Sequence, residues 1–338
     1  MNSKTRLVLS LTLAALVVVG GIAAGLLLSK PSKTASVSVR FPIPIVESGQ
    51  SPFYVAEDEG YYAKEGLQVK FNMGSRELNP VKMVVSGQDA FGVLGGPDTL
   101  LVARSKGVPL VAIAVLHRDS NFSCLLTLAS SGITQVKQLQ GKKVGFFYGH
   151  ISTDVLRALF RKEDVAMTEV DVGFDYSQLI TGQIAAEWAF TVTAGLDLPA
   201  RGVPVNVISP ASYGIITQGY TIFAREDFIR DHPDVVLRFL RATLHGVRDA
   251  VAHPKEANAA LLRRDPSLNV ELSLRRQLAY NAVTSDSAQY PAGYMDAAMF
   301  QSTYDRLAKE GEITHPFAVS SAFTTKFLDQ IYGRHIGH

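Results

Sequence analysis

A strand, a tight turn and a helix start follow one another around residue 50, and this unit constrains the fold most strongly. Residues 37–46 are extended and apolar, with two prolines that suit the end of a strand. Ser51 is a good N-cap and Pro52 suits the first helical position, while Gly49 permits a turn just before them. The alternating residues 67–71 then predict a second strand. The free N–H groups of the helix N-terminus therefore face the loop that follows the first strand.

The same alternation continues along the chain and predicts an α/β fold with parallel sheets. Further predicted strands are 90–94, 108–116, 123–129, 143–148, 171–174 and 186–190, and predicted helices are 80–86, 98–105, 155–162 and 177–182. From Asp231 the pattern is helical, with one apolar face through 236–251 and further helices at 255–263, 270–283, 294–309 and 321–332. Residues 85–90 resemble 180–185, each after a short helix and before a strand, which indicates two lobes of similar design.

The composition is that of a globular protein and gives no electrostatic footprint for nucleic acid. Of 338 residues, 47% are hydrophobic and 19% charged, and the net charge is +2. Without residues 1–30 there are 30 basic and 31 acidic residues, a net charge of −1. We therefore expect no nucleic-acid partner.

The first thirty residues predict an export segment. Lys4 and Arg6 precede an uncharged run at 7–28, which is long enough to span a bilayer, and Lys30 follows it. No cysteine comes directly after the run, so a bacterial lipid attachment is excluded. A cleaved signal peptide and an uncleaved inner-membrane anchor both remain open, and either one exports the rest of the chain to the periplasm or another extracytoplasmic space.

The sequence contains no common catalytic or metal-binding motif. It lacks a P-loop, a Gly-x-Gly-x-x-Gly turn, a nucleophile elbow and a His-Glu-x-x-His pair. The only cysteine, Cys124, lies in an apolar predicted strand and is expected in the core. We expect neither a metal nor a cofactor.

Polar, glycine-containing and aromatic loops follow the predicted strands, at the sheet edge where open α/β sheets bind ligands. Such loops stack a planar or apolar ligand and hydrogen-bond its edges. Several of these residues also have plain structural interpretations: core packing for Trp188, a solvated charge for Arg76, and helix capping for Asp98 and Ser51. The candidate ligand-binding residues are Gln50, Ser51, Arg76, Gly96, Asp98, Tyr148, His150, Ser152, Thr153, Trp188 and Tyr220.

Several segments together resemble one family of exported proteins. Residues 52–56 (Pro-Phe-Tyr-Val-Ala), 60–62 (Gly-Tyr-Tyr) and 65–67 (Glu-Gly-Leu) are similar to the first-helix signature of periplasmic binding proteins for nitrate, sulfonates, taurine and the thiamine-precursor pyrimidine. The resemblance continues at 85–93, 106–111, 139–145 and 232–246 and covers residues 40–330, nearly all of the chain after the export segment. The combined pattern is specific for the family, although no single piece is.

The resemblance implies a type II periplasmic-binding-protein fold, in which two α/β lobes joined by two crossovers close on a ligand. Lobe 1 would be 37–125 plus 222–338, and lobe 2 would be 126–221. The protein would be a monomer that delivers its small-molecule ligand to the membrane permease of an ABC importer. Tyr148, Trp188, Tyr213 and Tyr220 favour a pyrimidine-like heterocycle or an aromatic acid, and Arg76 is the candidate partner of a carboxylate or sulfonate.

Two alternatives stay open. The long apolar run motivates a membrane-tethered ligand sensor. The other is an enzyme of thiamine-pyrimidine metabolism on the same fold, for which His150 beside Ser152 or Asp154 is the only plausible catalytic group. Enzymes of that kind carry a cysteine-rich motif, and the single cysteine of this chain argues against that activity.

Overall fold

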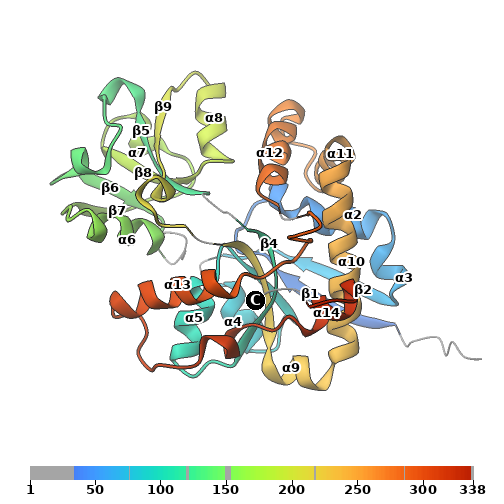
Figure 1. Ribbon diagram of the computed structural model, residues 1–338. Coiled ribbons are helices and arrows are strands. Elements are labelled where there is room, and N and C mark those ends of the chain that lie inside the picture. The colour runs from blue at the N-terminus through green and yellow to red at the C-terminus, as the bar shows by residue number, and fades with distance from the viewer. Residues whose placement is uncertain are drawn as a thin grey trace, which may run out of the picture. The chain divides into compact units, whose positions relative to one another are not determined.

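The strands form two five-stranded sheets (Figure 1), with the orders β2-β1-β3-β10-β4 and β7-β6-β8-β5-β9. The computed structural model describes residues 34–75, 77–118, 122–148, 154–216, 218–284 and 286–335. Residues 36–338 form one compact unit that contains both sheets. The first sheet consists of β1 (Ala35–Arg40), β2 (Leu67–Asn72), β3 (Phe91–Leu94), β4 (Leu110–His117) and β10 (Gly219–Arg225). The second consists of β5 (Ser123–Leu128), β6 (Lys143–Phe146), β7 (Thr168–Asp171), β8 (Ala186–Phe190) and β9 (Val205–Ile208).

Both sheets are mixed, whereas the sequence predicted parallel sheets. β1 and β3 are parallel, as are β6 with β7 and β6 with β8. β10 lies antiparallel between β3 and β4, and β5 lies antiparallel between β8 and β9. The exceptions are the strands that directly follow the two passages between the sheets, because a chain that returns from the other sheet is not bound to the direction of a local βαβ unit.

The chain passes from the first sheet to the second between β4 and β5, and returns between β9 and β10. β5 starts at Ser123 and β10 at Gly219, so each strand spans one of the lobe boundaries predicted after residues 125 and 221. From here on, lobe 1 is the first sheet with its helices and lobe 2 is the second sheet with its helices.

Lobe 1 carries most of the helical residues. Its longest helix, α10 (Pro233–Ala252), buries Val236, Leu240, Leu244 and Val247, four of the residues that the sequence placed on the apolar face. The other helices of this lobe are α2 (Ser51–Asp58), α3 (Tyr61–Lys64), α4 (Pro80–Val85), α5 (Asp98–Ser105), α9 (Glu226–Asp231), α11 (Pro254–Arg264), α12 (Val270–Val283), α13 (Ala297–Lys309) and α14 (Lys326–Tyr332), with 3-10 turns η1 (Ser48–Gln50) and η6 (Val319–Ala322).

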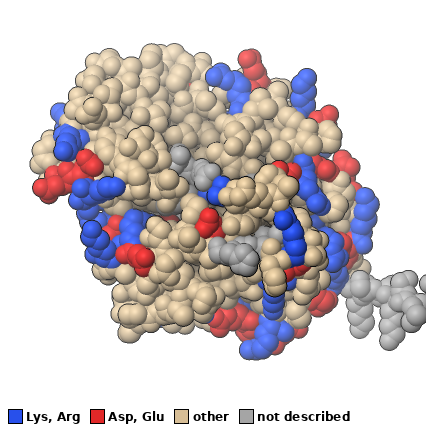
Figure 2. All heavy atoms as spheres, viewed as in Figure 1, with Lys and Arg blue, Asp and Glu red and all other residues tan. Residues whose placement is uncertain are grey.

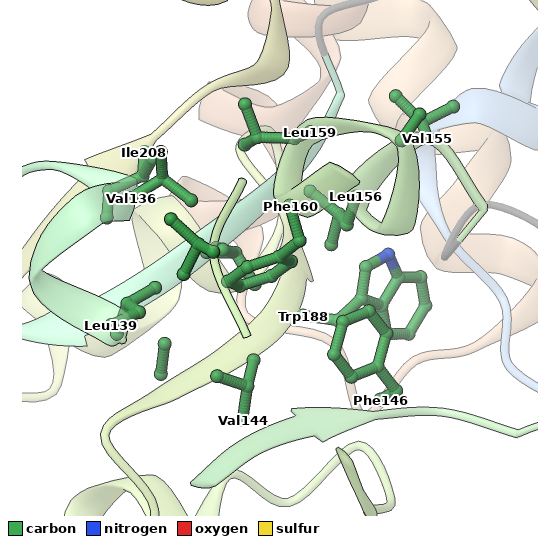
Figure 3. Packing of buried hydrophobic residues seen from close by; sticks show 14 of the residues in the cluster. Val136, Leu139, Val144, Phe146, Val155, Leu156, Leu159, Phe160, Trp188 and Ile208 are labelled. Atoms are coloured by element: carbon green, nitrogen blue, oxygen red, sulfur yellow. The ribbon is translucent and has the colours of Figure 1, made fainter. Parts of the chain in front are cut away.

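Lobe 2 has the helices α6 (Asp154–Lys162), α7 (Ser177–Ile180) and α8 (Ala194–Ala200), and 3-10 turns η2 (Ala129–Ser131), η3 (Val136–Leu139) and η5 (Pro210–Tyr213). On one side of its sheet, Trp188 packs with Phe146 and Leu156 in a buried cluster (Figure 3). Leu126, Leu179 and Ala189 belong to a second cluster.

The sequence missed α8 and β9, and it placed the strand observed as β7 several residues too late. Gly195 and Pro199 interrupt the helical pattern of α8, and four residues of β9 give too short an alternation to stand out.

Among the described residues, no helix is long and apolar enough to cross a membrane. The predicted export segment lies outside those residues. Basic and acidic side chains intermingle on the face of the molecule in Figure 2.

Candidate ligand-binding site

A cavity of about 130 Å³ lies between the two sheets, with walls from both lobes. An apolar cavity of similar size holds a single benzene ring, so this one suits a small planar group. Lobe 1 contributes the loop after β1, the loop after β3, the start of β10, and α12. Lobe 2 contributes the loop after β7, the end of β8 and the helix α8, and Phe122 lies in the passage just before β5. The lining residues are Pro42, Ile43, Ile45, Glu47, Gly95, Phe122, Phe174, Tyr176, Phe190, Thr193, Ala194, Asp197, Leu198, Arg201, Tyr220, Arg276 and Tyr280.

Glu47 supplies a buried carboxylate to the lobe 1 wall, with only 2% of its surface exposed. Its Oε1 accepts a hydrogen bond from the Tyr220 hydroxyl at 2.7 Å, and its Oε2 accepts one from the Gly49 N–H at 3.0 Å. A Cβ at Gly49 would lie 2.7 Å from Glu47 Oε1 and 3.1 Å from the Tyr220 ring. Residue 49 therefore has to be glycine for the carboxylate and the tyrosine to meet.

The two tyrosines beside Glu47 are held as neutral hydrogen-bond donors. Burial raises the pKa of Tyr220 and of Tyr280 well above the ordinary value, and the negative charge of Glu47 and a hydrogen bond to it raise both further. A hydroxyl that keeps its proton can donate to a carboxylate or to a ligand. The wall around Glu47 is therefore polar only at these few points.

Backbone strain is concentrated at this cavity. Of the three non-glycine residues with positive φ in the described part of the chain, two line it: Tyr176 at 56° and Tyr220 at 52°. Such a conformation costs on the order of 1–3 kcal/mol and persists where the surrounding structure imposes it. One strained tyrosine comes from each lobe, which indicates that their ring positions are set for contact with something in the cavity.

His117 lies behind the tyrosines and completes the aromatic wall. Its ring centroid is 4.9 Å from those of Phe122 and Tyr220 and 5.4 Å from that of Tyr280. Burial lowers the pKa of His117 to about 3, so the imidazole is neutral at physiological pH. It adds packing but no charge to the site.

An ion pair joins the two lobes beside the cavity. The guanidinium of Arg276 on α12 pairs with the carboxylate of Asp197 on α8 through both oxygens, with Nε 2.9 Å from Oδ1. Both residues line the cavity. A second pair between lobes, Arg161 Nη2 to Glu310 Oε2 at 2.6 Å, links α6 to the end of α13.

Of the residues predicted from sequence, Tyr220 lines the cavity. Gln50 and Ser51 are fully buried beneath it, where Gln50 Oε1 accepts from the Tyr54 hydroxyl at 2.8 Å and the Ser51 hydroxyl donates to Gln277 Oε1 at 2.5 Å. These two positions support the loop that carries Glu47, and their contact with a ligand stays a prediction.

Four further predicted residues are not among the lining residues. Trp188 is buried in the lobe 2 core, in line with its structural interpretation. Asp98 starts α5, is buried and pairs with Arg306 of α13. Gly96 neighbours the lining residue Gly95, and its backbone approaches the Gln218 carbonyl. Tyr148 is 40% exposed in the turn after β6.

Arg76, His150, Ser152 and Thr153 lie outside the described residues, so their predicted contacts stay predictions. Within the part of the chain that is described, no group of three or more His, Cys, Asp and Glu side chains is placed to hold a metal ion.

The sequence pointed to the loop of Glu47 but not to Glu47 itself, and it missed Asp197, Arg276 and Tyr280. Glu47 carried one available signal, because an acidic residue three positions before Gln50 resembles a capping box, which the structure contains. Asp197 lies on the unpredicted α8, and Arg276 and Tyr280 lie more than two hundred residues after Glu47, so no local pattern connects them.

Residues 48–257 match the family described as "NMT1/THI5 like", which is more than half of the chain. The chain belongs to the NMT1/THI5-like family. Three curated relatives align over most of its length. The riboflavin-binding protein RibY of Chloroflexus aurantiacus is 27% identical, over 82% of each chain. The formylaminopyrimidine-binding protein of Halalkalibacterium halodurans is 24% identical, over 80% of this chain and 84% of the relative. The 4-amino-5-hydroxymethyl-2-methylpyrimidine phosphate synthase of Uromyces fabae is 27% identical, over 66% and 69%.

Solved structures show the same fold. The periplasmic aliphatic sulphonate binding protein SsuA of Escherichia coli aligns with a TM-score of 0.67 at 14% identity, over 88% of this chain and 99% of SsuA. The two-sheet α/β architecture predicted from the sequence is therefore confirmed as a periplasmic-binding-protein fold.

Proposed function

We propose that this protein is an extracytoplasmic solute-binding protein that captures a small planar organic ligand between its two lobes and delivers it to the permease of an ABC importer. The observation that carries the proposal is the cavity shared by both lobes, with aromatic walls and one buried carboxylate. A ligand that contacts both lobes at once favours their closed arrangement, and closure is the signal that such proteins present to a partner. The binding proteins for riboflavin and formylaminopyrimidine among the relatives support this function.

The cavity favours a ligand with one aromatic or heteroaromatic ring over a larger one. Phe122, Phe174 and Phe190 offer ring faces or edges for packing. The hydroxyls of Tyr220 and Tyr280 donate to Glu47, and their oxygens can accept a hydrogen bond from the ring edge. The ligand classes we propose are pyrimidine-like heterocycles and aromatic or sulfonate acids.

A thermal-unfolding screen tests the proposal. We expect at least one of a set of aminopyrimidines, flavins, sulfonates, taurine and aromatic acids to stabilise the protein, by about 2.7 kcal/mol at a hundredfold excess over its dissociation constant. Tyr280→Phe should weaken that ligand about 3- to 10-fold, because it removes one hydroxyl from the cavity wall.

The matched control is Tyr62→Phe, which removes a buried hydroxyl that contacts Thr243, and neither residue lines the cavity. It should leave the affinity unchanged. A screen without any stabilising compound, or equal effects of both variants, would contradict the proposal.

An enzyme of pyrimidine synthesis is the second candidate, because some relatives are named as synthases. Against it, the only cysteine, Cys124, is fully buried in β5, and burial raises its thiol pKa. Incubation of the protein with its bound ligand, followed by mass spectrometry, separates the candidates. An unchanged ligand mass after prolonged incubation supports binding. A chemically altered ligand or an altered protein side chain supports the enzyme.

The proposal includes export from the cytoplasm, directed by the apolar run at residues 7–28. The exported protein is then either a cleaved, secreted form or a sensor tethered to the membrane. Mass spectrometry of the mature N-terminus distinguishes a cleaved signal from a retained anchor. Light scattering checks the monomeric state that we propose.

A further inference from the structure

Glu47 is a buried negative charge without a positive partner. It is 98% buried, and among the described residues its carboxylate forms hydrogen bonds but no ion pair. A carboxylate in the interior is costly unless a cation or several donors compensate it. Its donors are the N–H groups of Gly49 and Gln50 and the hydroxyls of Tyr220 and Tyr280, which solvate the carboxylate but bring no positive charge.

The other charges at the cavity do not balance Glu47. Arg276 is engaged by Asp197 through both oxygens, so that pair is close to neutral. Arg201 lines the cavity but is exposed to solvent, where its charge is screened. The inner part of the cavity therefore carries the charge of Glu47.

The aromatic walls of the cavity also favour a cationic ligand over an anionic one. The faces of Phe, Tyr and Trp rings are negative and attract cations, an effect of about 0.5–2 kcal/mol per contact. Six aromatic side chains line this cavity, from both lobes. An anion in the same place would meet a buried carboxylate and negative ring faces, and would lose its hydration as well.

We infer that Glu47 determines the charge class of the ligand: the cavity accepts an aromatic ring that presents a cationic or N–H-donor edge to the carboxylate, and it rejects anions such as sulfonate or nitrate. This rests on the proposed function of the cavity and narrows it. Of the ligand classes proposed above, it excludes the aromatic and sulfonate acids and retains the heterocycles that carry N–H donors. The fold itself is shared with sulfonate-binding and nitrate-binding proteins.

Three probes of equal ring size and different charge test the inference: benzamidine, benzamide and benzenesulfonate, measured by calorimetry on the full exported chain. We expect benzamidine to bind at least about tenfold more tightly than benzenesulfonate, because an attraction to the charge of Glu47 replaces a repulsion. Glu47→Gln should weaken benzamidine by about tenfold or more and leave benzenesulfonate equal or tighter. Glu59→Gln, which removes an exposed carboxylate on the same lobe, should change neither affinity.

The outcomes are separable. Equal or tighter binding of benzenesulfonate to the wild-type protein overturns the role of Glu47 and leaves the ligand-binding function standing. Failure of all three probes to bind at about 10 mM, a weak limit for ligands of this size, counts against both. Circular dichroism shows whether Glu47→Gln folds, and if it does not, the wild-type ratio of benzamidine to benzenesulfonate affinity still decides the inference.

Discussion

Glu187 is an uncompensated acid in the core of lobe 2. It lies on β8 with 1% of its surface exposed, and among the described residues no side chain donates a hydrogen bond to its carboxyl oxygens. Burial, and secondarily the charge of Asp175, raises its pKa to about 8. The side chain is therefore a neutral carboxylic acid at pH 7.

The raised pKa of Glu187 predicts the sign of a pH effect on stability. The unfolded chain releases this proton near pH 4.5 and the folded chain near pH 8, so the free energy of unfolding falls as the pH rises through this window. Glu187→Gln should remove that decline and make the protein more stable than wild type at pH 8, by about 1–3 kcal/mol. Urea unfolding at several pH values measures it. An identical slope in the variant, or the same change in the exposed Glu59→Gln, would contradict the assignment.

For individual residues, the sequence predicted which loops lie at the cavity better than which side chains line it. Tyr220 could be chosen because an aromatic residue after a loop is a common ligand contact, and it does line the cavity. Trp188 looked equally suitable, yet it lies on the face of β8 that packs on α6. Strand alternation assigns residues to two faces but does not say which face meets the other lobe.

Helix α10 crosses α2 without any space for a side chain at Gly246. A Cβ there would lie 2.1 Å from the Pro52 carbonyl oxygen and 2.8 Å from the Ala56 Cβ. The glycine therefore permits the close approach of the helix that begins directly after the Glu47 loop. This contact fixes the position of the loop as well as the lobe 1 core.

Gly246→Ala should destabilise the protein by about 1–3 kcal/mol, because the strain of overpacking exceeds the gain of about 1 kcal/mol from alanine's helix propensity. Gly195→Ala in α8 is the matched control, since a Cβ there lies 3.7 Å from its nearest neighbour. The control should be neutral or slightly stabilising. Urea midpoints compare the two, and a Gly246→Ala variant as stable as wild type would show that the helices separate easily.

Elements with regular periodicity were predicted closely. α12 spans Val270–Val283 and β8 spans Ala186–Phe190, the bounds that the sequence indicated. α8 was missed because its own residues disfavour a helix, and its contacts with β8, β9 and α12 must supply the stability that propensity lacks. The part of the site on α8 could therefore not be predicted from local sequence.

The two lobes meet through long-range contacts that sequence spacing does not encode. Asp197 and Arg276 are 79 residues apart and lie on helices of different lobes, yet they form a bidentate ion pair beside the cavity. Arg161 and Glu310 form the other interlobe pair described above. The two-lobe design could be predicted from repeated strand–helix units, whereas the residues that hold the lobes together follow only from the assembled fold.

The Asp197–Arg276 pair is expected to set how much of the unliganded protein is closed. Its side chains are 22% and 15% exposed, so the pair is only partly screened, and losing its charge should cost on the order of 1 kcal/mol, about fivefold in the closed-to-open ratio. Asp197→Asn should therefore increase the radius of gyration of the ligand-free protein in X-ray scattering. It should also weaken ligand binding by a similar factor, because the apparent affinity scales with the fraction of binding-competent protein.

The control Asp231→Asn removes an exposed pair within one lobe and should change neither quantity. Weaker binding without a change in the radius would mean that Asp197 contacts the ligand directly, and the ion pair would then not control closure.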